Sequence, residues 1–453
     1  MLLQSLLRPV LTPIMRGVFD AFGSSAPAWS STALTALAAW YDPSDLSTMF
    51  NDSAGTTPVA TPGTVADSSN PVGLIQDKSG NGHHASQSTS TARPLLSARV
   101  NLLTYTEDFG NAFWRNFNTS NVFSVNSATA PNGEITANKV SASTSSIAHG
   151  FDKLNVASAG DVFSIYAKAA EYSFIHIGCG GFQPQNGVSY AATFDLTAGT
   201  VIQNGSWQTN AEIEEVGSGW FRCSAKTLYA GSVVVMYSPT STTNTYLGDG
   251  TSGIYVWGAQ LEHTTATPYQ RVTTDSDYDG DPAKFPYKEQ FDGVDDFQVT
   301  ASGGGASTAA MVCLGFTSTL AGTAQTLWTD RTGNTGLSLG ISAGNAIVLS
   351  GGNGSSIVTV TGDAVTLGTP YVVTALYDGT DLSVQLNDAT PATGACALSA
   401  GQAAITLGAA TGGASGFFKG SIFDVLYVKD ATTSPADVAE AKAWVAAKSG
   451  VTL

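Results

Sequence analysis

Charged residues are scarce in this chain, and basic ones most of all. Only 12% of its 453 residues are Asp, Glu, Lys or Arg, and 19 Lys and Arg stand against 35 Asp and Glu, which gives a formal charge of −16. Nucleic acids and anionic membranes are bound by clustered Lys and Arg. We therefore expect neither nucleic acid nor an anionic membrane as a partner.

Cysteine and long apolar runs are also rare. The four cysteines (Cys179, Cys223, Cys313 and Cys396) form no C-x-x-C pair, which argues against a zinc knuckle or a redox motif. Each stands among apolar or small residues, so we expect buried free thiols, with a Cys179–Cys223 disulfide as the alternative. No run is long and apolar enough to span a bilayer, so we expect no membrane span.

No arrangement of residues for catalysis is recognisable. H-E-x-x-H is absent, and His83 and His84 are adjacent, so on a strand they would point to opposite faces. A glycosidase needs two carboxylates that face each other across a sugar, and no spacing in the chain identifies such a pair. We predict that the protein is not an enzyme.

Glycine and period-two alternation are what the chain has in abundance. It contains 49 Gly, and many short stretches alternate apolar and polar residues between turn residues. This is the pattern of half-buried β-strands joined by tight turns. The predicted fold class is all-β, with two β-sandwich or jelly-roll domains. Stretches of this kind are 163–168, 173–177, 219–223, 233–237, 311–316 and 371–378.

Residues 1–23 differ from the rest of the chain. Their apolar residues recur every four positions and would lie along one stripe of an amphipathic helix, while Pro9 and Pro13 lie off that stripe and would break the helix into short turns. A short segment cannot cover such a face by itself, so we predict an anchor into a larger assembly. Packing on its own domain and a secretion signal are the alternatives. The predicted anchor residues are Leu3, Leu7, Leu11, Met15 and Phe19.

Two stretches far apart in the chain fit one β-sandwich. The first is D-K-S-G-N-G-H-H-A at 77–85, preceded by A-A-W-Y-D-P at 38–43, and the second is F-D-G-V-D-D-F at 291–297. Together they resemble the opening of laminin-G-like (concanavalin-A-like) jelly-roll domains. The resemblance implies one jelly roll in two parts, residues 28–97 and 275–453.

The intervening residues 98–274 are predicted to form a second domain inserted into the first. This insert opens with N-L-L-T-Y-T-E-D-F at 101–109 and closes with W-G-A-Q-L-E at 257–262 and T-P-Y-Q-R-V at 267–272. The combination is similar to carbohydrate-binding-module-like jelly rolls of bacteriophage head spikes and tail fibres. It implies a second β-sandwich, tethered at both ends.

Two helices complete the expected architecture. The amphipathic helix and its linker occupy residues 1–27. Near the other end, Ser434-Pro435-Ala436-Asp437 has the capping residue, the proline at the first helical position and the acidic residue at the third that are typical of a helix start. We expect a short C-terminal helix that continues through Trp444.

The densest acidic cluster lies where the chain leaves the insert. Alternate carboxylates on a glycine-containing turn can converge on calcium, although Pro286 stands where an EF-hand loop has its glutamate. Calcium is therefore the candidate cofactor, and a solvated acidic loop is the alternative. The candidate metal ligands are Asp275, Asp277, Asp279 and Asp281.

Other carboxylates have weaker claims to a metal. Asp77 beside the glycine turn is expected to accept hydrogen bonds from backbone N–H groups, and a turn-holding role is also expected for the aspartates of 292–296. Glu107 and Glu262 match positions at which the similar phage modules hold structural calcium.

Sugar binding requires exposed aromatic rings beside polar side chains. Trp220 and Trp257 stand in apolar, strand-like stretches and are expected in the core, whereas Trp207 stands in the polar turn N-G-S-W-Q-T. The predicted carbohydrate-binding residues are Trp207 and Trp114.

The resemblance to phage appendages implies a function. It is that of a virion surface component, a tail fibre or a head spike or fibre, at the exterior of a bacteriophage particle. Residues 1–23 would bind other virion structural proteins, host cell-surface polysaccharide would be the ligand, and a homo-oligomer, a trimer, would be the assembly. A decoration or tail-assembly protein that binds no sugar is the alternative, and a polysaccharide depolymerase is less favoured.

Overall fold

The described elements are β-strands, short 3-10 turns and one C-terminal α-helix, which confirms the all-β prediction. The structure is a computed structural model and describes residues 34, 36–116, 121–180, 188–263 and 266–453. The predicted anchor residues of segment 1–23 lie outside this part of the chain. No helix among the described residues is long and apolar enough to cross a membrane.

The chain divides into two compact units, and the second interrupts the first. Unit 1 comprises the described residues up to Pro58, Val72–Pro94 and Asp281–Leu453, and unit 2 comprises Val59–Pro71 and Leu95–Gly280.

The segment Val59–Pro71 is placed differently from the sequence expectation, which assigned it to the first jelly roll. In unit 2 the backbone N–H of Leu96 donates to the carbonyl of Asn70 (3.0 Å), and the N–H of Tyr278 donates to the carbonyl of Gly63 (3.4 Å). Such long-range backbone bonds cannot be read from a loop-like composition.

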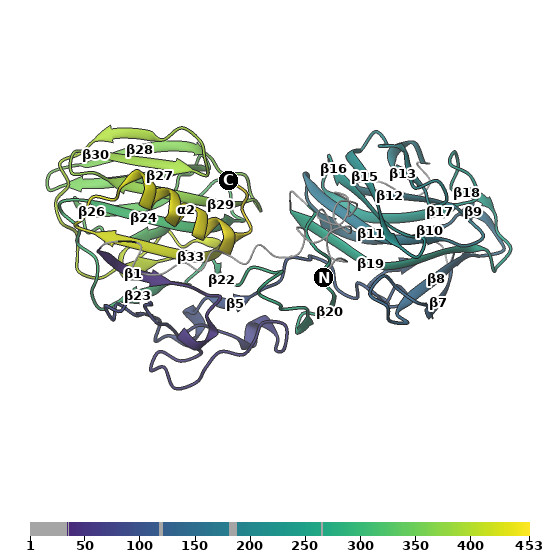
Figure 1. The fold of residues 1–453 in the computed structure, drawn as a ribbon, viewed down its shortest axis with the longest axis horizontal. Helices are drawn as coiled ribbons and strands as arrows, with labels where there is room; N and C mark the ends of the chain where they lie inside the picture. The colour runs from purple at the N-terminus through teal and green to yellow at the C-terminus, as the bar shows by residue number, and fades with distance from the viewer. Residues whose placement is uncertain (1–33, 35, 117–120, 181–187, 264–265) are drawn as a thin grey trace, which may run out of the picture. The chain divides into compact units, whose positions relative to one another are not determined.

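Two antiparallel sheets make up unit 1 (Figure 1). The first has the order β31 (Ala392–Ala395), β30 (Asp381–Leu386), β29 (Pro370–Tyr377), β24 (Ala310–Ser318), β33 (Lys419–Lys429) and β22 (Lys288–Asp292), with β1 (Leu37–Tyr41) also paired to β33. The second has the order β2 (Met49–Phe50), β3 (Leu74–Ile75), β4 (Ala85–Ser86), β23 (Gln298–Thr300), β32 (Thr406–Leu407), β25 (Gln325–Thr329), β26 (Thr335–Ile341), β27 (Ala346–Asn353) and β28 (Ile357–Ala364). Short 3-10 turns are η1 (Leu46–Thr48), η3 (Ser90–Ala92) and η7 (Thr411–Gly413).

The long strand β33 joins the two parts of the interrupted unit. Its residues Lys419 to Ile422 pair with β22, which follows the insert, and its residues Val425 to Val428 pair with β1, which precedes the insert. Residues from both sides of the insert therefore hydrogen-bond to the same strand, which holds the two parts together.

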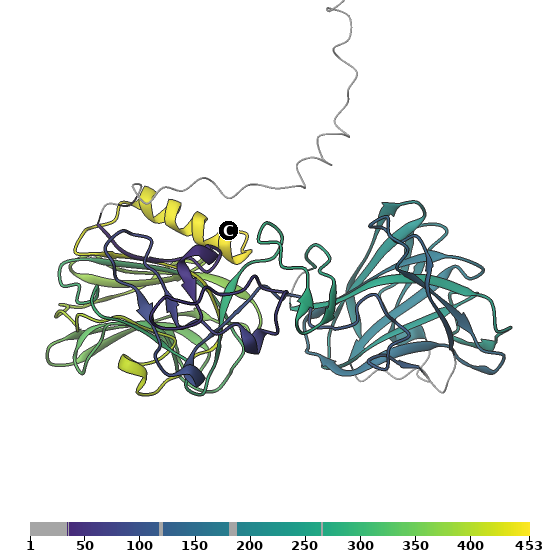
Figure 2. The ribbon, with the colours of Figure 1, turned by 90° about the horizontal axis from the view of Figure 1, so that it is seen from below.

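The helix α2 (Pro435–Ser449) covers the outer face of the first sheet and contacts β24, β29 and β33 (Figures 1 and 2). Strand β24 is buried at eight of its nine positions because one face meets the helix and the other meets the interior. The predicted helix start is confirmed: Ser434 accepts from the N–H of Asp437, the Asp437 carboxylate accepts from the N–H of Ser434, and Pro435 is the first helical residue.

Unit 2 is also a sandwich of two antiparallel sheets. One has the order β14 (Thr200–Gln203), β13 (Ala192–Asp195), β12 (Phe174–Gly180), β17 (Gly231–Ser238), β10 (Gly150–Ala157) and β6 (Arg115–Asn116). The other has the order β15 (Gln208–Gly217), β16 (Trp220–Thr227), β11 (Asp161–Ala169), β19 (Gly253–His263), β8 (Ala137–Ala142) and β7 (Asn121–Ala128). Smaller elements are the pairs β18 (Thr245–Leu247) with β9 (Ser146–Ala148) and β20 (Val272–Thr274) with β21 (Asp277–Tyr278), strand β5 (Leu95–Ser97), and the turns η2 (Asp67–Ser69) and η6 (Val188–Tyr190).

The predicted alternation appears in the core of unit 2. On β11, Phe163, Ile165 and Ala167 belong to the apolar cluster between the two large sheets, and Ile175 and Ile177 of β12 do so from the opposite sheet. Three of the four cysteines (Cys223, Cys313 and Cys396) are buried free thiols, as expected.

Candidate functional site

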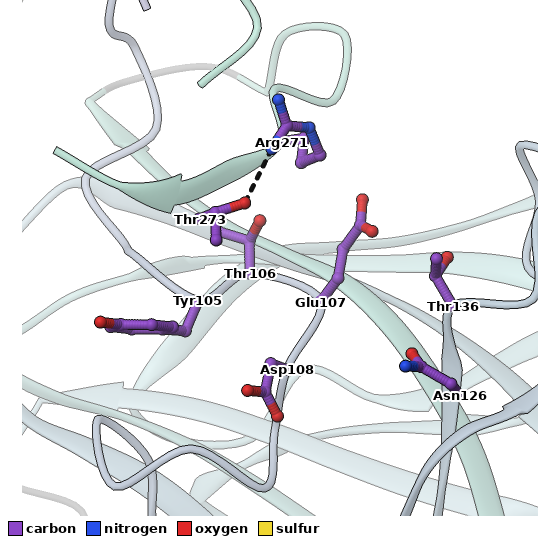
Figure 3. A pocket seen from close by; sticks show the side chains of 8 residues that line it. All are labelled: Tyr105, Thr106, Glu107, Asp108, Asn126, Thr136, Arg271 and Thr273. Carbon is purple, nitrogen blue, oxygen red and sulfur yellow. Dashed lines mark hydrogen bonds between the residues drawn. The ribbon is translucent and has the colours of Figure 1, made fainter. Parts of the chain in front are cut away.

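A pocket of about 110 Å³ opens in unit 2 (Figure 3). Ligand pockets for drug-sized molecules have volumes of about 300–1,000 Å³, so this one admits only a small polar group or part of a sugar ring. We call it the Glu107 pocket. Its lining residues are Tyr105, Thr106, Glu107, Asp108, Asn126, Thr136, Arg271 and Thr273.

The two ends of the insert meet at this pocket. The backbone N–H of Tyr105 donates to the carbonyl of Thr273 (3.2 Å), and the N–H of Thr106 donates to the carbonyl of Val272 (3.0 Å). The motif T-Y-T-E-D-F therefore lies alongside the strand that ends the motif T-P-Y-Q-R-V. Residues from both tethers of the domain thus build one site.

Two aromatic rings support the polar wall of the pocket. The hydroxyl of Tyr269 donates to Glu107 Oε1 (3.2 Å) and is 2.7 Å from Thr106 Oγ1. The indole of Trp257 donates to Thr136 Oγ1 (2.9 Å), and its ring lies 4.6 Å from the ring of Tyr269, centroid to centroid. Because these rings are packed and hydrogen-bonded, the polar groups they contact are held in fixed positions.

The charged side chains that line the pocket are two acids, Glu107 and Asp108, and one guanidinium, that of Arg271. Burial raises the pKa of Glu107, while the hydroxyl of Tyr269 and the charge of Arg271 act in the opposite direction. Arg271 is held by Asp277 (2.8 Å), by Asp279 (3.3 Å) and by Thr273 Oγ1 (2.7 Å). The pocket thus offers fixed donors and acceptors together, which is what neutral hydroxyl-rich ligands require.

The four aspartates of the predicted calcium site are paired with basic side chains, and calcium binding there stays a prediction. Asp275 pairs with Arg99 (2.6 Å), and Asp277 and Asp279 pair with Arg271. Asp281 belongs to unit 1 and lies 3.5 Å from Lys284. Arginine and lysine side chains thus lie within ion-pair distance of all four carboxylates. Among the described residues, the carboxylates close enough to share a metal are those of Asp292, Asp295 and Asp296.

Those three aspartates are engaged in a turn, as the sequence predicted. Asp292 Oδ1 accepts from the N–H of Val294 (2.7 Å) and of Asp295 (3.3 Å), and Asp296 Oδ2 accepts from the N–H of Asp292 (2.8 Å). Burial and the neighbouring carboxylates raise the pKa of Asp296 to about 7.

The turn-holding role predicted for Asp77 is confirmed. Its carboxylate accepts from the N–H groups of Ser79 (2.8 Å) and His83 (3.0 Å). Between them, Gly80 and Gly82 have φ of 89° and 75°, a backbone conformation that favours glycine. Glu262, in unit 2, accepts from the N–H of Thr267 instead of facing the pocket.

The tryptophans divide between core and surface. Trp220 and Trp257 are 1% and 4% exposed, as predicted. Trp114 is also only 4% exposed and packs edge-on against Phe151, so its prediction as a sugar platform is wrong. Trp207 is half-buried, and its ring lies 5.5 Å from that of Tyr229, which is 52% exposed. Sugar binding by Trp207 remains a prediction.

Two overlapping stretches have the G-x-S-x-G spacing of hydrolase nucleophiles, at 336–340 and 340–344. In those enzymes the serine stands on a sharp turn from a strand to a helix. Here Ser338 lies within β26 and Ser342 lies in the turn from β26 to β27, so neither serine has that setting.

Sequence reasoning singled out Glu107 but missed Asn126, Thr136, Arg271 and Thr273. Arg271 stands in a motif that resembles phage modules, and that motif was the available signal. Asn126 and Thr136 lie on and beside the β7–β8 hairpin, and their approach to Glu107 depends on tertiary structure alone.

No protein-family model matches the chain, and neither does any curated protein sequence. Among solved structures, the chain is similar to the CBM40 module of a Ruminococcus gnavus sialidase bound to α2,6-sialyllactose, with 18% identity, a TM-score of 0.26 and coverage of 30% of this chain and 84% of that one. Domains LG4-5 of the mouse laminin α1 chain match at 12% identity and a TM-score of 0.27, covering 61% and 88%. A Limulus polyphemus SAP-like pentraxin matches at 16% identity and 0.27, covering 35% and 80%. Similarities this low support no inference about a ligand.

Proposed function

We propose that this chain is a surface component of a bacteriophage particle, a tail fibre or a head spike or fibre, and that unit 2 binds host cell-surface polysaccharide through the Glu107 pocket. The observation that supports binding is the pocket itself, where two acids, a guanidinium and three threonine hydroxyls surround a small polar space. The assignment to a phage rests on the motif resemblance at both ends of the insert.

The further parts of the proposal concern assembly and place. The chain forms a homo-oligomer, a trimer, at the exterior of the particle, and residues 1–23 attach it to other virion proteins. It binds polysaccharide without cleaving it. Trp207 and Tyr229 form a second surface in unit 2 on which a sugar face can stack, because the Tyr229 ring is exposed.

A glycan array probed with the full-length chain tests the binding proposal. We expect retention on one class of bacterial polysaccharide and about a tenfold weaker affinity for Glu107→Gln, since one lost charge-assisted hydrogen bond costs about 1.5–3 kcal/mol. The matched control is Glu212→Gln, the same change at an exposed position of β15 in unit 2.

Equal binding by Glu107→Gln and wild type would show that the pocket is not the site. No binding to any glycan would favour the alternative of a structural decoration or tail-assembly protein. Release of reducing sugar ends from a bound polysaccharide would instead establish a depolymerase.

A further inference from the structure

A cluster of ionisable side chains is buried in unit 1 beneath α2. Asp42 follows β1, Asp424 lies on β33 and Lys448 lies in the last turn of α2. Asp42 is 2% exposed and Asp424 is fully buried, while the side chain of Lys448 is 19% exposed. We call these three residues the Asp42 cluster.

Lys448 approaches the Asp42 carboxyl directly. Its Nζ lies 3.2 Å from Asp42 Oδ2, which is one bond from the carboxyl carbon, and 2.5 Å from Ser44 Oγ. Lys78 also contacts Asp42 Oδ2 (2.9 Å), but it is shared with Asp45 (2.9 Å). Within the described part of the chain, Lys448 forms a salt bridge with Asp42 and no second carboxylate, whereas Lys78 is shared between two.

Asp424 supplies a second carboxyl group at this place. Burial raises its pKa well above the usual range, and Asp42 and Lys448 are its charged neighbours. The indole of Trp40 donates to Asp424 Oδ2 (3.4 Å). Burial of this kind favours the protonated form of the carboxyl group.

Two indoles shield the cluster from water. The rings of Trp40 and Trp444 meet edge to face at 5.8 Å, and Lys448 Nζ lies 4.8 Å from the centre of the Trp444 ring. A largely buried lysine amine in contact with a carboxyl, with a second buried carboxyl group near them, is the set of groups that amide formation requires.

We propose that Lys448 and Asp42 condense to an amide, an intramolecular cross-link. A proton passes from the Lys448 ammonium to the Asp42 carboxylate, and the free amine then attacks the carboxyl carbon to form the C–N bond. Asp424 donates its proton to the developing oxyanion and recovers it as the carbonyl re-forms. One C–O bond breaks, and its hydroxyl leaves as water with a proton from the nitrogen. The ammonium and the carboxylate become one neutral amide and one water, with no redox change.

The cross-link would join residues 406 positions apart in the sequence. It would tie the end of β1 to the last turn of α2, so that neither could be peeled from unit 1 while the amide is intact. This inference does not depend on the proposed function, because it concerns unit 1 alone.

The intact mass of the purified full-length chain tests the proposal. We expect it to fall below the sequence mass by one water, and a protease digest to contain a branched peptide that joins Asp42 to Lys448. A mass equal to that of the sequence would overturn the proposal, and so would a branch at Lys78.

Variants separate the chemistry from folding. Lys448→Arg keeps the charge but has no reactive amine, so it should show the full sequence mass. Asp42→Asn should instead lose one ammonia, because the side-chain amide nitrogen of the asparagine is then the leaving group. Asp424→Asn should leave most of the chain unlinked, and Asp424→Glu should restore the link. If Lys448→Arg still lost one water, the assignment of the cross-link to Lys448 would be contradicted.

The matched control is Lys442→Arg on the same helix. Lys442 Nζ lies 2.6 Å from Asp388 Oδ1, but the side chain of Asp388 is 60% exposed. This ion pair is solvated, so we expect Lys442→Arg to retain the loss of one water. A return to the full sequence mass in Lys442→Arg would show that the cross-link forms at Lys442 and not at Lys448.

Discussion

Asp152 in unit 2 and Glu289 in unit 1 are both 1% exposed, but their surroundings differ. Asp152 accepts two hydrogen bonds from the guanidinium of Arg115 (2.8 and 2.5 Å). Glu289 accepts from the neutral amide of Gln298 (2.9 Å), and burial raises its pKa to about 8. A cation beside a buried carboxyl group favours its charged form, whereas burial alone favours its protonated form.

Asp424 in unit 1 is a further case of the second kind, with a neutral indole as its hydrogen-bond donor. The comparison teaches that the acidic composition of the chain does not determine which partner a buried acid has. In unit 1 the acids whose pKa is raised, Glu289 and Asp424, lie in the interior. In unit 2 Asp152 is paired with an arginine, and Glu107 and Asp108 line the pocket for which a ligand is proposed.

The largest effect is expected from Lys448→Arg in unit 1. Closing a long loop covalently destabilises the unfolded chain, by up to about 5 kcal/mol in the loop-entropy model. The variant keeps the ion pair with Asp42, so a loss of stability measures the cross-link and not the charge. Chemical denaturation should show unit 1 unfolding at a lower denaturant concentration while unit 2 unfolds as before. An unchanged unit 1 transition would contradict the expectation.

A smaller effect is expected from Arg115→Ala in unit 2. This change leaves the Asp152 carboxylate buried without its cation, which costs about 1–3 kcal/mol, at the low end because the Arg115 side chain is 47% exposed. Urea denaturation at neutral pH measures it. Arg115→Lys, which keeps a cation, serves as the control and should lose less. Equal losses in both variants would show that the fork of the arginine, and not its charge, is what matters.

An effect of opposite sign, which depends on pH, is expected from Glu289→Gln. Because the ordinary pKa is 4.5 and the folded value is about 8, the unfolded chain releases this proton first, and the free energy of unfolding falls as pH rises between these values. The fall is at most about 1.4 kcal/mol per pKa unit. The variant lacks this term, so its stability relative to wild type should increase from pH 5 to pH 8.

Urea denaturation of both proteins at the two pH values measures this difference. Asp296, whose pKa is raised to about 7, titrates in both proteins, and its charge also contributes to the raised pKa of Glu289. A constant difference between pH 5 and pH 8 would show that Glu289 is ionised throughout.

Local features were predictable from the sequence. The capping residue, proline and acid at 434–437 act within one helical turn, so the start of α2 could be read directly. The polar neighbours of Trp207 and the apolar neighbours of Trp220 gave the correct order of exposure because strand burial follows local alternation.

Long-range pairings were not predictable. Trp114 is buried because Phe151 of a distant strand packs against it, and Asp275 is neutralised by Arg99, which is 176 positions away. The Asp42 cluster likewise joins both ends of unit 1. Such contacts follow from strand order, which composition and spacing do not encode.

A structure of the full-length chain with the glycan that the array identifies tests the central claim most directly. The account predicts a sugar ring in the Glu107 pocket, with its hydroxyls hydrogen-bonded to Glu107 and Arg271. A ring bound only at Trp207 and Tyr229, or a Glu107 pocket that stays empty at saturating glycan, would contradict it.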